Sequence, residues 1–261
     1  MTEVRRDRLR TVVLDDRAAM GAAAAQHAAT RLKGILAAQP RARVIFAAAA
    51  SQQDMLDVLA GVEGIDWNRV DAFHLDEYVG LPQGDPRSFG RWLGDHVWSR
   101  VQPGRVELLD GGNPDPDAEC RRYGALLDEG GIDLALIGIG ENGHLAFNDP
   151  HVADFEDPLT VKVVEIDETS RRQQVRDGAF DAFEDVPRLA MTVTMSAILA
   201  SRSISVVVPG AQKAKAVART LDGPIETGCP ASALRRHPDA VLFVDRQAFS
   251  LVGREQPQGV S

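Results

Sequence analysis

Short apolar runs alternate with helix-like segments along almost the whole chain, and this alternation limits its fold more than any other feature. Examples are IDLALIGIG at 132–140, SISVVVPG at 203–210 and AVLFVD at 240–245. Strands that are apolar almost end to end are typical of a parallel sheet covered by helices on both faces. The sequence therefore predicts an α/β fold.

The order of the elements predicts a Rossmann-like, doubly wound arrangement with a mainly parallel sheet and helices on both faces. We expect one domain over 1–252 and a loose, polar tail over 253–261. Ser51 with Asp54 resembles a capping box, and Ser88 can cap another helix. Further strands are predicted at 42–50, 69–78, 105–110, 161–166 and 189–194. Helices are predicted at 16–38, 52–61, 89–101 and 115–130, and others begin near Thr169, Ser196, Ala211 and Ser232.

Charge and composition exclude several classes of partner. The 261 residues carry a net charge of −9, whereas nucleic-acid binding needs a basic surface. No apolar run reaches the roughly 18–20 residues that span a bilayer. Cys120 and Cys229 form neither a metal-binding spacing nor a disulfide framework. We therefore expect a cytoplasmic protein that binds neither nucleic acid nor membrane and has no metal site.

Polar residues follow the predicted strand at 132–140, in the segment GHLAFNDP. In an open α/β sheet, ligands bind beyond the carboxyl ends of the strands. Gly140 and Gly143 permit a tight turn and close approach of the backbone to a ligand. His144 can exchange protons near neutral pH, and Asn142 and Asp149 can orient it. The alternative is a strand–loop–helix junction with a surface histidine.

Two other strand ends carry candidate site residues. Asp76 and Glu77 end the segment FHLDE, where a partly desolvated carboxylate can act as a general base; they could instead cap a turn or helix. Lys213 follows SISVVVPG at a predicted helix start, and free N–H groups beside a lysine form an anion site. For this segment alone, a solvated surface lysine is the favoured alternative.

The combination of segments resembles the glucosamine-6-phosphate deaminase/isomerase family, whose fold is shared with 6-phosphogluconolactonases. The resemblance runs from about residue 40 to 246. DEYVGL and GHLAFNDP are its specific pieces, and DAECRRY, MTVTMSAIL, PGAQKA and SALRRHPDAVLFVD match in order and spacing. Tyr78 and the AFND segment favour the deaminase branch over the lactonase branch, which typically has an arginine after the DE pair.

The resemblance implies conversion of glucosamine 6-phosphate to fructose 6-phosphate and ammonia, without a metal or organic cofactor. It implies that Asp76 takes the C2 proton, that His144 helps to open the sugar ring and that Asp149 supports His144. Lys213 would contact the phosphate. An arginine would hold the phosphate as well; counting along DETSRRQQVR places Arg176 there, with Arg172 as the alternative.

The chain departs from the family pattern at both ends of the expected site. Asn142 stands where the family has an aspartate, which favours the neutral form of His144. Asp149 replaces a glutamate. The first phosphate loop, usually rich in glycine, serine and threonine, is FAAAASQQDM here, with Ser51 and the backbone N–H groups left as donors.

Three functions are consistent with these residues: a sugar-phosphate isomerase or deaminase, a related enzyme such as a lactonase acting on another sugar derivative, and a non-catalytic sugar-phosphate sensor. The presence of Asp76, His144 and Asp149 favours an enzyme, because a binding protein needs no base. The expected partner is a small sugar phosphate, and the sequence leaves a homo-oligomer open.

Overall fold

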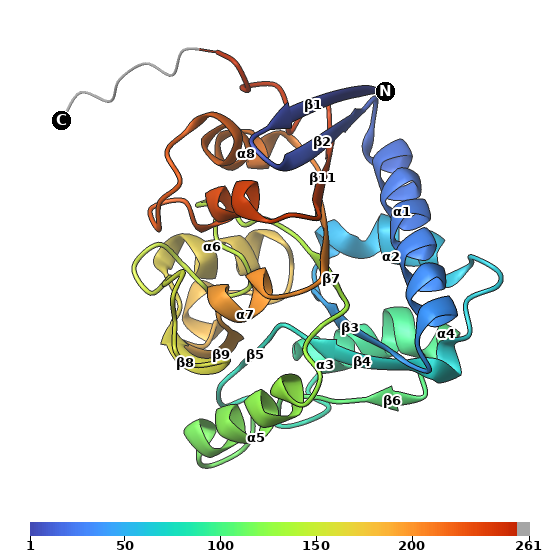
Figure 1. The fold of residues 1–261 in the computed structure, drawn as a ribbon. Helices are drawn as coiled ribbons and strands as arrows, with labels where there is room; N and C mark the ends of the chain where they lie inside the picture. Colours follow the sequence, from blue (N-terminus) through green and yellow to red (C-terminus); the bar gives the residue numbers. More distant parts are fainter. Residues whose placement is uncertain (255–261) are drawn as a thin grey trace.

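The computed structural model describes residues 1–254, and most of the strands form one twisted sheet (Figure 1). Its order is β1-β2-β11-β10-β7-β3-β4-β6, and all neighbours are parallel except β1 and β2. The strands are β1 Thr2–Arg6, β2 Leu9–Leu14, β3 Ala42–Phe46, β4 Val70–His74, β5 Asp76–Tyr78, β6 Arg105–Val106, β7 Leu134–Ile137, β8 Val161–Glu165, β9 Leu189–Val193, β10 Ser203–Val208 and β11 Ala240–Asp245. The predicted α/β class and mainly parallel sheet are confirmed.

Helices cover both faces of this sheet, as predicted. Alternate residues of β7 show this: Leu134 and Leu136 pack into the core under α1 to α4, whereas Ala135 and Ile137 pack under α5, α7 and α8. The α-helices are α1 Arg17–Ala38, α2 Gln53–Ala60, α3 Phe89–Leu93, α4 Ser99–Val101, α5 Pro116–Asp128, α6 Glu168–Arg176, α7 Met195–Leu199 and α8 Ala214–Asp222. Shorter helical turns are η1 Ala50–Gln52, η2 Trp67–Arg69, the π-helical η3 Gly94–Trp98, η4 Phe183–Asp185, η5 Ala211–Lys213 and η6 Pro230–Arg236.

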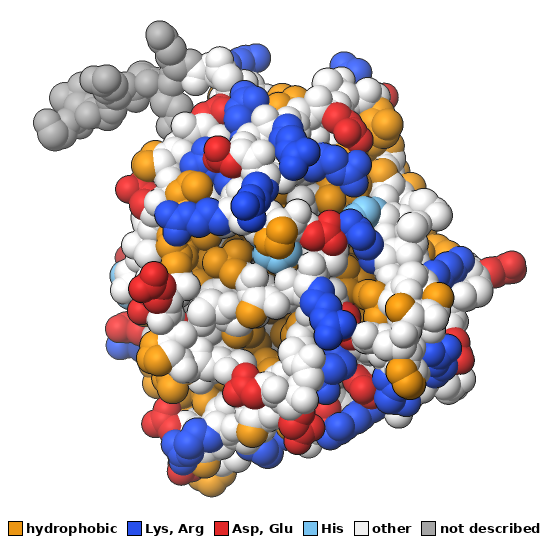
Figure 2. Space-filling model, in the orientation of Figure 1, with side chains coloured by type: hydrophobic (Ala, Val, Ile, Leu, Met, Phe, Trp, Pro, Cys, Tyr) orange, Lys and Arg blue, Asp and Glu red, His pale blue; other side chains and the backbone are white. Residues whose placement is uncertain are grey.

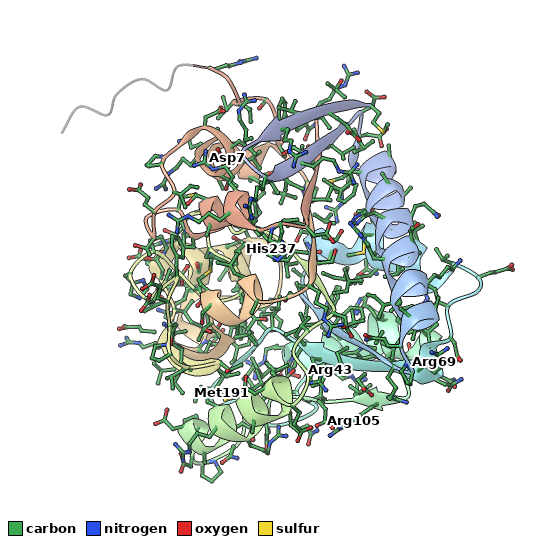
Figure 3. The ribbon with its side chains drawn as sticks, in the orientation of Figure 1. Asp7, Arg43, Arg69, Arg105, Met191 and His237 are labelled. Atoms are coloured by element: carbon green, nitrogen blue, oxygen red, sulfur yellow. The ribbon has the colours of Figure 1, made fainter. Side chains whose placement is uncertain are left out.

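The predicted strand at 69–78 is in fact two strands in two different sheets. β4 lies in the large sheet, and β5 pairs antiparallel with β9 in a small sheet of order β5-β9-β8. Leu75 makes the transition, because its N–H donates to Phe46 of the large sheet while its carbonyl accepts from Val193 of the small sheet. Figure 3 marks Met191 of β9, which pairs with Glu77. The small sheet therefore begins directly beside Asp76.

The other local predictions agree with the structure only in part. The predicted strand at 105–110 shortens to β6, which carries Arg105 at the sheet edge (Figure 3). The hairpin of β1 and β2 was not predicted, because the polar residues in MTEVRRDRLR hide its alternation. Ser88 caps α3 as predicted, since its Oγ accepts from the Arg91 N–H at 3.2 Å. The prediction of a capping box at Ser51 and Asp54 is wrong. The helix α2 has no side-chain cap, and Asp54 pairs with Arg17 instead.

The predicted tail at 253–261 falls mostly outside the described residues, and the domain limits at 1–252 stay a prediction. Within residues 1–254, no helix combines the length and apolar character needed to cross a membrane.

Candidate active site

Four segments that follow parallel strands meet around one solvent-open cavity. Ser51 comes from the turn after β3, and Asp76 is the first residue of β5, directly after β4 and Leu75. Gly140 and His144 come from the loop after β7, and Lys213 from the turn after β10. The edge of the sheet at which ligands were expected is thus the edge that carries the cavity.

Asp76 lines the cavity and has little access to solvent, with 8% of its surface exposed. Burial, assisted by the charge of neighbouring Glu77, raises the pKa of Asp76 to about 8. A carboxylate that is costly to ionise holds a proton more strongly than an exposed one. Asp76 can therefore accept a proton from a weakly acidic carbon and return it nearby.

Glu77 lies in the same strand but points the other way, because adjacent side chains of a strand face opposite sides. Its carboxylate accepts the backbone N–H groups of Tyr78, Phe89 and Gly90 at 3.0–3.1 Å, and so holds the start of α3. Burial raises the pKa of Glu77 to about 7, although these N–H groups act to lower it. Glu77 was predicted to bind substrate, but the structure places it beneath α3 and outside the cavity lining.

His144 is anchored through its backbone and one side of its ring. Its N–H donates to Asn142 Oδ1 at 3.0 Å, and its carbonyl accepts from the Gly140 N–H at 2.9 Å. A Cβ at position 140 would lie 2.1 Å from the ring, so glycine is required there. Gly143 has a φ of +92°, and a Cβ there would lie 2.7 Å from Cys229 Sγ. These glycines shape the loop, and only Gly140 lines the cavity.

Three oxygen atoms surround Nδ1 of His144. Asn142 Oδ1 and Ser170 Oγ lie at 2.9 Å, and Asp149 Oδ1 lies at 3.0 Å. Nδ1 is therefore held within the protein, which leaves Nε2 for a ligand in the cavity. The ring orientation that results is the one a proton-transfer histidine needs.

Asp149 is fully buried and tightly hydrogen-bonded. Asn142 Nδ2 and Ser170 Oγ donate to its Oδ1 at 2.8 and 2.5 Å, and the Asp167 N–H donates to its Oδ2 at 2.9 Å. Burial alone would raise the pKa of Asp149, but the contacts with His144, Asn142 and Ser170 outweigh it and lower this pKa to about 2. Asp149 therefore stays ionised beside His144 at any working pH.

The loop that carries His144 is also fastened to the small sheet. Thr192 of β9 pairs in register with Asp76, and its Oγ1 accepts the Phe147 N–H at 3.1 Å. Asn148 Nδ2 donates to the Val193 carbonyl at 2.8 Å. The same strand therefore supports both Asp76 and the loop of His144.

Lys213 supplies a buried positive charge to the lining of the cavity. Only 9% of its surface is exposed, and burial lowers its pKa. Nζ donates to Gln173 Oε1 at 3.1 Å, and none of the carboxylates in residues 1–254 lies within ion-pair distance of it. Figure 2 shows acidic and basic side chains interspersed over one face of the molecule. A localised cation such as Lys213 is what an acidic protein needs to bind an anionic ligand.

The two candidate arginines differ in their surroundings. Arg176 pairs with Glu141 and lies close enough to Lys213 for its charge to lower the lysine pKa. Arg172 pairs with Glu168 and stacks over Phe183 on the exposed side of α6. Neither lines the cavity, but Arg176 is the arginine beside Lys213.

Sequence reasoning missed Gln52, Gln173 and Gln174, which line the cavity, and Ser170, which contacts His144. Ser170 and Gln173 face inward from α6, and the buried Gln52 follows Ser51 and donates to its Oγ at 3.2 Å. The spacing of Ser170 and Gln173 was the available signal, since residues three apart share one side of a helix. Within the described chain, no group of three His, Cys, Asp or Glu could hold a metal ion.

A family model described as glucosamine-6-phosphate isomerases/6-phosphogluconolactonase matches residues 15–243. The chain belongs to this family. The glucosamine-6-phosphate deaminase of Halothermothrix orenii is 38% identical over 191 residues, which cover 72% of this chain and 77% of the relative. That of Listeria innocua is 37% identical over 188 residues, covering 72% and 78%. The resemblance inferred from the sequence is confirmed, and this member of the family is an enzyme.

Solved structures agree with the assignment. A monomeric glucosamine-6-phosphate deaminase superposes with a TM-score of 0.85 at 32% identity, over 92% of this chain and 99% of that one. The 6-phosphogluconolactonase of Thermotoga maritima has a TM-score of 0.73 at 20% identity, over 90% and 98% of the two chains. At that identity the lactonase supports the fold alone.

Proposed function

We propose that this enzyme converts glucosamine 6-phosphate to fructose 6-phosphate and ammonia. The observation that carries the proposal is that three groups line one cavity. They are the buried carboxylate Asp76, whose pKa is raised, His144, which ionised Asp149 holds, and the buried Lys213, which pairs with no carboxylate of residues 1–254. The family assignment supports the same reaction. The substrate would lie with its phosphate at Lys213 and its C1–C2 end between Asp76 and His144.

Binding begins at the anionic end. The Lys213 ammonium would donate to the phosphate, with Arg176 turning toward it from Glu141 and Ser51 donating from the loop after β3. The Ala47 N–H already donates to the Leu136 carbonyl, so the N–H groups of residues 48–50 are the other backbone donors of that loop. Holding the phosphate fixes the distance of C1 and C2 from the two proton-transfer groups.

Ring opening and proton transfer follow at the other end. His144 would take the proton of the C1 hydroxyl and return one to the ring oxygen, giving the open-chain aldehyde. Asp76 would then remove the C2 proton while the C1 carbonyl oxygen takes up a proton, which gives an enolamine with a C1=C2 double bond. Transfer of a proton to C1 then moves the double bond to C2 and the nitrogen, leaving an iminium group at C2. Addition of water to that bond releases ammonia and leaves the ketone of fructose 6-phosphate.

A panel of amino-sugar phosphates, scored for ammonia release and ketose formation, tests the proposal. Glucosamine 6-phosphate should give equal amounts of both products, because the reaction makes one of each. Hydrolysis of 6-phosphogluconolactone without ammonia release would instead support a lactonase. Binding without turnover of any member would support a sensor. The cytoplasmic location and the oligomeric state stay predictions.

Asn142→Asp is expected to preserve or raise the turnover of glucosamine 6-phosphate and to shift the histidine-controlled limb of the pH profile upward. The new carboxylate would replace an amide oxygen 2.9 Å from Nδ1 and would favour the imidazolium form. Ammonia release by both proteins between about pH 5 and 9 measures this shift. Superimposable profiles would contradict an electrostatic role for position 142.

A further inference from the structure

We propose that Gln173 is a positioning residue that holds the Lys213 ammonium toward the cavity while leaving its charge free for the substrate's anionic group. The inference deepens the proposed function and rests on it for the identity of the substrate. It assigns to a neutral side chain the task of fixing the orientation of a buried cation.

The hydrogen bonds of Gln173 fix both ends of its amide. Oε1 accepts from Lys213 Nζ at 3.1 Å and from the Glu141 N–H at 3.2 Å, and Nε2 donates to Asp177 Oδ2 at 3.2 Å. Two donors at one end and an acceptor at the other define which atom is oxygen. With 8% of its surface exposed, Gln173 has little freedom to leave this position.

The arrangement keeps carboxylates away from the ammonium. Burial lowers the pKa of Lys213, while the charges of Asp177 and Glu141 raise it, so both carboxylates lie within electrostatic reach. Neither forms an ion pair with Nζ, because Gln173 Nε2 holds Asp177 and Arg176 holds Glu141. The acceptor that actually contacts Nζ is therefore uncharged.

A neutral acceptor suits a lysine that must bind a phosphate. A carboxylate at this position would form a buried ion pair, and the incoming anion would have to compete with it. An apolar side chain would leave Nζ without a partner and free to take other rotamers. Glutamine avoids both conditions, because its oxygen directs the ammonium without neutralising it.

Two variants separate these effects. Gln173→Met keeps the length and approximate volume of the side chain but removes the hydrogen bond. Gln173→Glu keeps the acceptor but adds a negative charge. Gln26→Glu, at an exposed position of α1, adds the same charge away from the cavity and serves as the matched control.

We expect Gln173→Glu to raise KM for glucosamine 6-phosphate by at least about tenfold, and Gln173→Met by a smaller factor, with kcat within about threefold of the wild type. Gln26→Glu should change neither constant. The dissociation constant of inorganic phosphate, measured by calorimetry on the folded enzyme, should follow the same order. Because this probe needs no turnover, it reports on the cation separately from the chemistry.

The outcomes distinguish this inference from the proposed function. Phosphate binding that depends on Lys213 but is unchanged in both Gln173 variants would overturn the role of Gln173 and leave the deaminase proposal intact. Phosphate binding that weakens in the expected order, in an enzyme inactive on glucosamine 6-phosphate, would support Gln173 and overturn the deaminase proposal. If wild type and Lys213→Ala bind phosphate equally well, the role given to the lysine is wrong, and with it that of Gln173.

Discussion

Asp76→Asn is expected to lower kcat on glucosamine 6-phosphate by at least about two orders of magnitude. The amide has nearly the same size and can still form hydrogen bonds, but it cannot accept the C2 proton. Substrate binding should change little, because the anionic end of the substrate is proposed to lie at Lys213. Steady-state kinetics with the purified variant provide the measurement, and unchanged turnover would exclude Asp76 as the base.

The stability of the same variant, measured against pH, tests whether Asp76 is buried in the native state. Folding raises the pKa of Asp76 from 3.8 to about 8, so the native state holds a proton that the unfolded state has lost between these values. The free energy of unfolding contributed by Asp76 therefore falls as the pH rises through this window. Asparagine has no such dependence. Relative to the wild type, Asp76→Asn should gain stability from pH 4 to 8 in denaturant titrations, and a loss of stability at pH 8 would contradict the burial of this carboxylate.

Lys213→Ala is expected to raise KM by about a hundredfold, which corresponds to the loss of a charge-assisted contact of roughly 3 kcal/mol. The protein should still fold, because no carboxylate in the described chain depends on Lys213 for an ion pair. Initial rates over a wide range of substrate concentration measure the effect, and the fall in kcat should be smaller.

Lys215→Ala is the matched control for this experiment. Lys215 lies two residues further along in α8, is exposed, and carries the same charge. Its removal should leave KM nearly unchanged, and the wild-type KM should rise with ionic strength more than that of Lys213→Ala. Equal effects of the two substitutions would mean that the general charge of the protein, rather than a placed cation, attracts the substrate.

The sequence was sufficient to predict the α/β class, the mainly parallel sheet and the edge of the sheet that carries the cavity. It also identified five residues that line this cavity: Ser51, Asp76, Gly140, His144 and Lys213. These follow from local signals, since an apolar run predicts a strand and the polar residue after it marks the strand end. The split at Leu75 could not be predicted in this way. The run from Val70 to Tyr78 is continuously buried, so its pattern does not reveal the change of hydrogen-bonding partner.

Residues that act through tertiary contacts were the ones that sequence reasoning missed or misplaced. Ser170 joins the His144 network only because α6 packs across the loop after β7. Gln173 contacts a lysine 40 positions away in the chain. Glu77 was grouped with Asp76 because the two are adjacent, and the pleat of the strand separates them. The resemblance to a family implied roles for single residues but did not indicate which residues contact one another in the fold.

Hydrogen bonds hold the His144 loop against the small sheet, so two different parts of the fold support the proposed site. Asp76 and the loop of His144 share β9 as their support, whereas Lys213 extends from a turn of the large sheet. A substitution in β9 would therefore disturb the supports of Asp76 and of the His144 loop together, and the turn of Lys213 less directly. Variation within β9 is thus expected to change the proposed proton-transfer groups before it changes the proposed phosphate site.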